Sequence, residues 1–214
     1  KFDLNKNNQN QTYALGIKEL WEIDPKNHNA GEIVHTTGWP LSSDTYGGSF
    51  LYHFDKNLVS IGFVVGLDYK NPYLSPYEEF QQFKHHPDII KHLKGGRRIS
   101  YGARALNEGG VQSLPKLTFP GGLLVGCEAG FLNVPKIKGT HLAIKSGIIA
   151  AETIFEDIDN ENELIKFSIN IKNSWLYKEL YSVRNIRPSF KWGFWKALAY
   201  SAVDTYFFRG RAPW

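Results

Sequence analysis

The chain has 214 residues, of which 42% are hydrophobic and 21% are charged, and its formal net charge is +4. This composition is that of an ordinary globular protein and excludes collagen-like, coiled-coil and broadly disordered chains. No stretch without Asp, Glu, Lys or Arg exceeds 11 residues, so we expect no transmembrane helix, which needs about 20 apolar residues. The single cysteine, Cys127, excludes an internal disulfide and any metal site built from several local cysteines.

The first half of the chain predicts a sheet followed by short helices. Residues 1–12 are rich in Asn, Gln and Lys, and we expect them to form a disordered lead-in. Aromatic, β-branched or alternating runs predict strands at 17–23, 32–37, 49–54, 58–67 and 97–105. The third and fourth strands are separated by three residues, which suits an antiparallel hairpin. Ser75 and Pro76 predict the start of a helix over 76–85, and a second helix is expected over 88–93.

The second half predicts more helix than strand. Residues 116–119 and 123–127 are expected to form two short strands, and the latter should be buried. A strong helical pattern covers 140–155. Its expected buried face consists mainly of small residues: Leu142, Ala143, Ser146, Gly147, Ala150, Ala151 and Ile154. Residues 166–180 are also expected to be helical.

Positive charge and aromatic residues are concentrated at the C-terminal end. Residues 166–214 hold nine Lys and Arg against two acidic residues, a net +7, so the rest of the chain carries −3. Between 188 and 214, nine of 27 residues are aromatic. Trp195, Leu198, Ala202 and Tyr206 follow a helical spacing there. The pattern predicts a helix lying in a membrane interface, and the alternative is a soluble helix that packs its aromatic face onto the domain.

Glycine positions suggest two places where a ligand could approach the backbone. Gly126, Gly130 and Gly139 surround the start of the helix expected over 140–155, whose free N–H groups could bind an anion. The alternative is an ordinary glycine-rich strand-to-helix turn. Gly47 and Gly48 precede the hairpin, and from chemistry alone an ordinary turn is favoured there.

No other catalytic or metal set is predicted. His85 and His86 are adjacent and would point apart on a helix, so a shared metal site is not expected. Four further histidines are interpreted as isolated: His35, His53, His92 and His141. Cys127 follows an expected buried strand and is interpreted as a packed thiol.

Long motifs nonetheless resemble one known family. They are GIKELW at 16–21, GWPL at 38–41, TYGGSFLYH at 45–53, GFVVGLDYKNPYLSPYEEFQQFKHHP at 62–87, YGARALNEGG at 101–110, PKLTFPGGLLVGC at 115–127, NVPKIKGTH at 133–141 and KNSWLYKELYSVRNIRPS at 172–189. Together they resemble the electron transfer flavoprotein-ubiquinone oxidoreductases, and the resemblance extends from about residue 13 to 214.

The resemblance implies a monotopic enzyme on the mitochondrial inner membrane or a bacterial cytoplasmic membrane. Such an enzyme carries FAD and one [4Fe-4S] cluster, accepts electrons from electron transfer flavoprotein and reduces ubiquinone. This chain would be its middle, because the family's first dinucleotide-binding βαβ unit and its cysteine-rich cluster domain are not in the sequence. The cluster ligands would therefore lie outside this chain, and no nucleic acid is expected as a partner.

Site residues follow from the matching motifs. Gly47 and Gly48 match the glycine pair that meets the quinone in the family. The FAD contacts implied by the second flavin segment are Gly126, Cys127, Gly130, Gly139 and Thr140. Cys127 stands where many related flavoproteins carry an acidic residue, although the family itself uses cysteine. Membrane contacts are implied for Trp192, Phe194, Trp195 and Phe208, in a segment that diverges more from the family than the motifs upstream.

The implied fold is of the α+β (mixed α/β) class. An antiparallel ubiquinone-binding sheet with helices, over 13–114, is joined to the returning half of an FAD/NAD(P)-binding-type domain, over 115–157. A helical segment over 158–214 follows, and its membrane-surface region is expected at 188–214. Two alternatives stay open at this point. One is a related flavoprotein dehydrogenase or geranylgeranyl reductase-like enzyme, and the other is a membrane-associated fragment that binds no cofactor.

Overall fold

The computed structural model describes residues 2–6, 8–157 and 163–212. The chain forms two compact units: a sheet unit, Tyr13–Leu106, and a helical unit made of Lys1–Thr12 and Asn107–Trp214. The boundary predicted at residue 114 thus lies inside the helical unit. The segments expected at 115–157 and 158–214 belong to that same unit.

Five strands form the sheet of the sheet unit in the order β2-β3-β4-β1-β5. Their bounds are β1 Tyr13–Glu22, β2 Ile33–Thr36, β3 Gly47–Phe54, β4 Leu58–Gly66 and β5 Arg97–Asn107. β3 pairs antiparallel with both β2 and β4, and β1 pairs antiparallel with β4. All five predicted strands are therefore present, and the hairpin turns at the three residues between Phe54 and Leu58 as expected.

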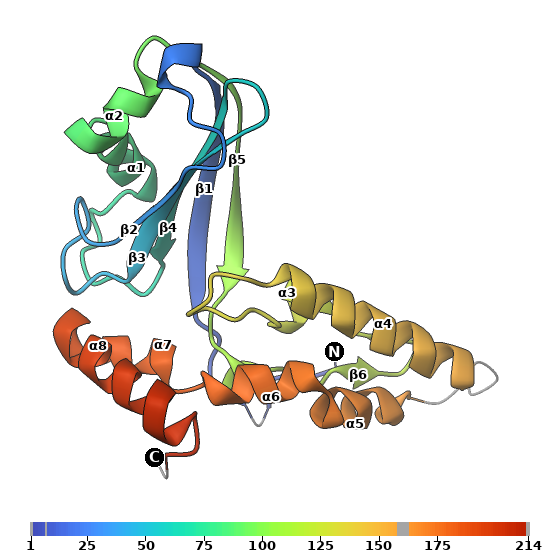
Figure 1. Ribbon diagram of the computed structural model, residues 1–214. Helices are drawn as coiled ribbons and strands as arrows, with labels where there is room; N and C mark the ends of the chain where they lie inside the picture. The colour runs from blue at the N-terminus through green and yellow to red at the C-terminus, as the bar shows by residue number, and fades with distance from the viewer. Residues whose placement is uncertain (1, 7, 158–162, 213–214) are drawn as a thin grey trace. The chain divides into compact units, whose positions relative to one another are not determined.

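Two helices cover one face of this sheet, α1 (Pro76–Lys84) and α2 (Pro87–Leu93) (Figure 1). Side chains alternate along the strands, so every second residue of β3 and β4 points toward the helices. The core between them is built from Leu51, Val59, Ile61, Phe63, Val65, Phe80, Phe83, Ile89 and Leu93. Ser75 caps α1 as predicted, since its side chain accepts a hydrogen bond from the N–H of Glu78.

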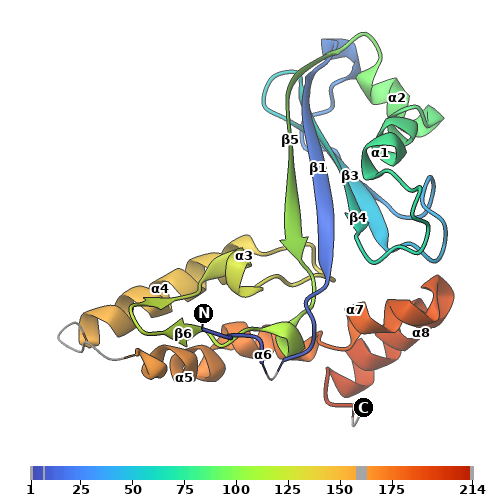
Figure 2. The same cartoon turned by 180° about the vertical axis from the view of Figure 1, so that it is seen from behind.

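The helical unit contains a two-stranded ribbon and six helices among the described residues. The ribbon is β6 (Thr118–Phe119) with β7 (Gly122–Leu123). The helices are α3 Gly126–Ala129, α4 Thr140–Glu156, α5 Ile165–Asn173, α6 Trp175–Ser182, α7 Ile186–Ser189 and α8 Phe194–Val203. The core of the unit includes Phe131, Leu142, Ile149, Phe167, Ile171, Leu176 and Leu180. Figure 2 shows α4 and α5 from behind.

The short strand predicted at 123–127 is wrong beyond its first residue. Gly126 adopts a φ of +62°, a left-handed conformation that interrupts an extended strand. Its N–H donates to the hydroxyl of Ser146 on α4 at 3.0 Å. The chain turns there into α3, so Cys127 lies on a short helix, half-buried, instead of at the end of a strand.

The helix predicted over 140–155 is confirmed as α4, but its buried face differs from the prediction. The buried residues of α4 are Leu142, Ser146, Ile149, Ala150 and Thr153. These positions repeat every three or four residues and define a face that packs on α3, α5 and α6. Gly147, Ala151 and Ile154 are exposed instead.

The helical run predicted over 166–180 is divided. Ser174 has an extended backbone, so the chain forms α5 and α6 in place of one helix. The C-terminal helix predicted within residues 189–208 begins only at Phe194, because Gly193 has a φ of +90° and separates a turn of 3-10 helix from α8. Across the described part of the chain, no helix is both long and apolar enough to cross a membrane.

The lead-in expected to be disordered is bonded to the rest of the helical unit. The N–H of Gln9 donates to the carbonyl of Gln112 at 3.1 Å. The N–H of Lys116 donates to the carbonyl of Leu4 at 2.8 Å. These backbone bonds account for the placement of a polar segment that has little to bury. Residues 1 and 7 of the lead-in lie outside the described residues.

Candidate functional site

Gly47 and Gly48 are the first two residues of β3, where it runs between β2 and β4. A Cβ at Gly48 would lie 2.8 Å from the carbonyl oxygen of Thr36. A Cβ at Gly47 would lie 2.5 Å from the carbonyl oxygen of Val64 and closer still to the side chain of Leu41. Both glycines are half-buried. The packing of neighbouring residues therefore requires glycine at these two positions, whether or not a ligand binds there. A valine at either position would disturb folding and ligand binding at the same time.

The short helix α3 contains two of the predicted FAD contacts. Left-handed glycines at its two ends and hydrogen bonds to neighbouring residues fix its position. Gly126 and Gly130, one at each end of α3, both have positive φ values, +62° and +94°, which glycine adopts without strain. The side-chain amide of Asn107 donates to the carbonyl of Cys127 at 3.0 Å. With the bond from Gly126 to Ser146, these contacts fix α3 against α4.

The start of α4 lies next to this short helix. Gly139 precedes Thr140, and among the described residues no side chain caps the first amides of α4 through the N-cap position. Thr140 is exposed. The 17-residue helix therefore presents unsatisfied N–H groups and the positive end of its dipole beside a hydroxyl group. The structure thus brings together the five predicted FAD contacts in the helical unit, whereas Gly47 and Gly48 lie in the sheet unit.

A carboxylate that the sequence interpretation missed holds the chain just before and just after Thr140. One oxygen of Glu179, Oε1, accepts from Asn133 Nδ2 at 2.7 Å and from His141 Nε2 at 3.0 Å. Lys136 Nζ lies 3.3 Å from the same oxygen. Asn133 and His141 lie 46 and 38 residues from Glu179 in sequence, so no spacing rule could have found this cluster.

The pKa of Glu179 reflects this arrangement. Burial raises the pKa, but the hydrogen bonds from His141, Asn133 and Lys136 outweigh it and lower the pKa below its ordinary value. The side chain is therefore ionised at neutral pH. His141 is further fixed by stacking on Trp175, with ring planes within 6° of parallel and centroids 5.9 Å apart.

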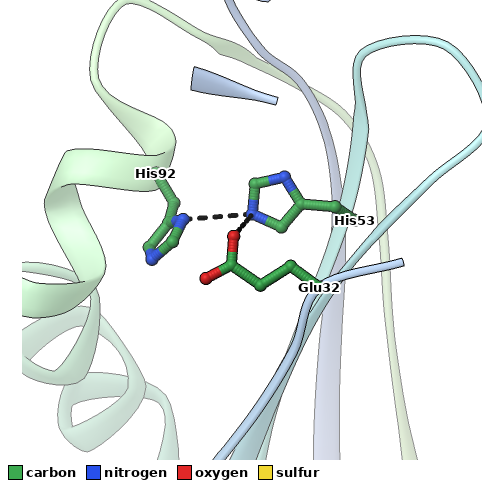
Figure 3. A group of neighbouring side chains, drawn as sticks. All are labelled: Glu32, His53 and His92. Carbon is green, nitrogen blue, oxygen red and sulfur yellow. Dashed lines mark hydrogen bonds and ion pairs between the residues drawn. The ribbon is translucent and has the colours of Figure 1, made fainter. Parts of the chain in front are cut away.

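A second cluster joins residues that were interpreted as isolated. His53 Nε2 lies 3.0 Å from His92 Nδ1 and 3.9 Å from a carboxylate oxygen of Glu32 (Figure 3). His53 Nδ1 accepts the backbone N–H of Asn29 at 3.2 Å, so in the neutral ring the proton is on Nε2 and is donated to His92. The interpretation of these two histidines as isolated is wrong: they form a buried hydrogen-bonded pair.

The same geometry argues against a metal ion at this cluster. The three ligand atoms lie within 4.8 Å of one another. A metal-bound histidine normally donates its second ring N–H to an acceptor, whereas the second nitrogen of His53 faces a donor. The arrangement fits a hydrogen-bonded histidine pair better than a metal centre. Burial and the neighbouring His92 lower the pKa of His53, and Glu32 opposes this only in part.

The predicted membrane-contact residues are mostly exposed. Trp195 is 76% exposed, Trp192 55% and Phe208 37%, while Phe194 is half-buried. Tyr206, which belongs to the predicted helical spacing, is 78% exposed, and Phe207, which was not singled out, is 80% exposed. The stretch from α7 to the π-helical turn Asp204–Phe208 therefore carries a large apolar surface.

Comparison with solved structures shows which proteins share the fold of this chain. A geranylgeranyl bacteriochlorophyll reductase-like protein from Thermoplasma acidophilum superposes with a TM-score of 0.60, covering 96% of this chain and 54% of that one at 15% identity. A flavoprotein/dehydrogenase from Cytophaga hutchinsonii gives a TM-score of 0.54, covering 90% of this chain and 44% of that one at 16% identity. At these identities the likeness is one of fold alone.

Sequence comparison then identifies the family. Residues 13–106 match the family described as ETF-QO, ubiquinone-binding. The mitochondrial electron transfer flavoprotein-ubiquinone oxidoreductase of Bos taurus is 58% identical over 226 aligned positions, which cover 100% of this chain and 37% of the bovine protein. The chain belongs to the electron transfer flavoprotein-ubiquinone oxidoreductase family, and it spans 37% of the length of this curated relative.

Proposed function

We propose that this chain supplies the ubiquinone-binding unit and part of the FAD site of an enzyme that transfers electrons from reduced electron transfer flavoprotein to ubiquinone. The observation that carries the proposal is the match of the entire sheet unit, residues 13–106, to the ubiquinone-binding family. The residues of the match coincide with the compact unit Tyr13–Leu106, so the sequence family and the folded unit have the same bounds.

The residues at the start of α4 fit a flavin. The uncapped amides and the exposed hydroxyl of Thr140 offer donors to the polar edge of an isoalloxazine ring. The flavin would also contact the backbone of Gly126, Cys127, Gly130 and Gly139. The positive end of the helix dipole favours negative charge at this position. FAD, when bound, supplies the redox chemistry, and this chain's groups hold and orient it.

The remainder of the flavin domain would come from the rest of the parent protein. Ile144, Ile148 and Phe155 form a second apolar stripe on α4, at 60%, 45% and 81% exposure. A helix that is apolar on two faces is normally covered on both. This stripe supports a flavin domain completed by a βαβ unit outside this chain. The [4Fe-4S] cluster also belongs outside it, because such clusters use several cysteines and the chain has only Cys127.

On the quinone side, Gly47 and Gly48 would let the flat ring of ubiquinone approach the start of β3. On the membrane side, the exposed aromatic residues Trp192, Trp195 and Phe208, with Phe194 beside them, would enter the interfacial layer of the bilayer. We place the parent protein, as a monotopic protein, on a mitochondrial inner membrane or a bacterial cytoplasmic membrane. The bovine relative is named as mitochondrial.

The test uses the full-length parent, purified in detergent. The visible spectrum should show bound flavin, and anaerobic mixing with reduced electron transfer flavoprotein and a soluble ubiquinone analogue should yield the quinol. A flavin-free protein would favour the alternative of a cofactor-free membrane protein. A flavin-containing protein that is reduced by the partner yet does not reduce quinone would favour a related flavoprotein dehydrogenase.

A further inference from the structure

We propose that Glu179 is a positioning residue that holds the start of α4 in the geometry needed at the flavin. This inference rests on the proposed FAD site. Its basis is that one carboxylate oxygen on α6 engages three groups from a single short segment, residues 133–141. Asn133 and Lys136 precede Thr140 in that segment, and His141 follows it directly. Thr140 therefore lies between residues anchored to the same atom.

The segment needs such an anchor because its backbone is not regular. Ile137 has a φ of +54°, a left-handed conformation that is costly for a β-branched residue. Asn133 and Lys138 exchange two backbone hydrogen bonds, at 3.0 and 3.2 Å, across this turn. The side chain of Asn133 is fully buried, and its Nδ2 bond to Glu179 connects the turn to α6. Strained turns of this kind persist when their surroundings fix them, and they are frequent beside ligands.

Charge gives Glu179 a second effect on the same site. Its carboxylate is ionised and lies 3.3 Å from the ammonium group of Lys136, so it offsets a cation close to the positive end of α4. Removing the carboxylate charge would leave Lys136 uncompensated there. A more positive environment stabilises the reduced, more negative flavin and raises its midpoint potential.

Two substitutions in the full-length parent separate the two effects. Glu179→Ala removes the acceptor, so three groups of the segment lose their common partner, and we expect FAD to bind about tenfold more weakly. Glu179→Gln keeps an oxygen that accepts from Asn133, so FAD retention should be largely restored while the midpoint potential rises. FAD content after dialysis and spectroelectrochemistry measure these two quantities.

Glu163 provides a matched control in the same unit. Its carboxylate is 17% exposed, close to the 19% of Glu179. Bonds from Lys116 and Thr118 also lower its pKa. Glu163→Gln should change neither FAD retention nor potential. The proposal is overturned if both Glu179 variants match the wild type, or if Glu163→Gln shifts the potential equally. Should Glu179→Ala fail to fold, the potential of Glu179→Gln decides. A wild-type parent without FAD would instead overturn the proposed function, and with it this inference.

Discussion

The two units differ in how completely each buries its own apolar surface. In the sheet unit, two helices cover one face of a five-stranded sheet, and strand alternation gives a closed core in which Phe63 and Phe80 are almost inaccessible. In the helical unit, α4 is buried along one stripe and leaves Phe155 81% exposed along another. We infer that the sheet unit can fold independently. The helical unit leaves apolar surface that further contacts would cover.

The largest expected effect follows from separating the units. Residues 13–106 expressed alone should unfold cooperatively in urea, because their core is closed. Phe80→Ala in that piece should lower the free energy of unfolding by about 3–5 kcal/mol. Residues 107–214 alone should lack a cooperative transition. A cooperative transition in the second piece and none in the first would reverse the comparison.

The aromatic surface of the helical unit gives the next largest effect. Replacing Trp195 and Phe208 together by alanine in the full-length parent should weaken binding to anionic vesicles about tenfold or more. Tyr73→Ala removes an aromatic residue that is 93% exposed outside that segment and should leave vesicle binding unchanged. Equal loss in both variants, or complete release of the wild type by high salt, would show that the segment does not enter the apolar layer.

A smaller effect, a dependence of stability on pH, is expected for the sheet unit. Because the folded state lowers the pKa of His53, the unfolded chain binds protons first as pH falls below about 6.5. Stability should therefore be full above that pH and decline as pH falls toward the folded pKa. Urea unfolding of residues 13–106 between pH 7.5 and 5 measures this, with His35→Gln as the control for an unpaired histidine at the surface of β2. A flat profile would contradict a lowered pKa of His53 in the folded state.

The smallest effect concerns the exposed side of α4. A Cβ at Gly147 meets no atom within 4 Å among the described residues, so Gly147→Ala should stabilise the chain by about 0.5–1 kcal/mol. Gly126→Ala should destabilise it, since φ at this position is +62°. Thermal unfolding compares the two. Destabilisation by Gly147→Ala in the full-length parent, but not in this chain, would indicate that the missing part packs tightly there.

Short-range sequence patterns predicted most of the secondary structure. The cap at Ser75, the three-residue hairpin connection and the helix over 140–155 are short-range predictions, and each was confirmed, although the buried face of that helix was predicted only in part. The strand expected at 123–127 failed because a hydrogen bond from Gly126 to Ser146, twenty residues away, favours a helical turn over an extended run of apolar residues. The breaks at Ser174 and Gly193 were missed for lack of a strong signal in the surrounding pattern.

The sites were less predictable than the fold. Gly47 and Gly48 were assigned through resemblance, because chemistry alone favoured an ordinary turn there. The glycines around α3 were already a candidate anion site from their position before a helix, and resemblance made them FAD contacts. The His53–His92 pair and the Glu179 cluster join residues 39 and up to 46 positions apart. Such pairings depend on strand register and helix packing, which no single-sequence pattern encodes.

The central claim is that ubiquinone binds at the start of β3, and a pair of glycine variants tests it directly. A Cβ at Gly96 would lie 2.8 Å from the carbonyl oxygen of Glu22, the same separation as between a Cβ at Gly48 and the carbonyl oxygen of Thr36. A Cβ at Gly96 would also lie 3.1 Å from the carbonyl oxygen of Leu93, so Gly96→Ala should strain the sheet unit at least as much as Gly48→Ala. The KM for a soluble ubiquinone analogue should rise about tenfold in Gly48→Ala and stay unchanged in Gly96→Ala, with equal flavin content. Equal KM values in the two variants would contradict the account.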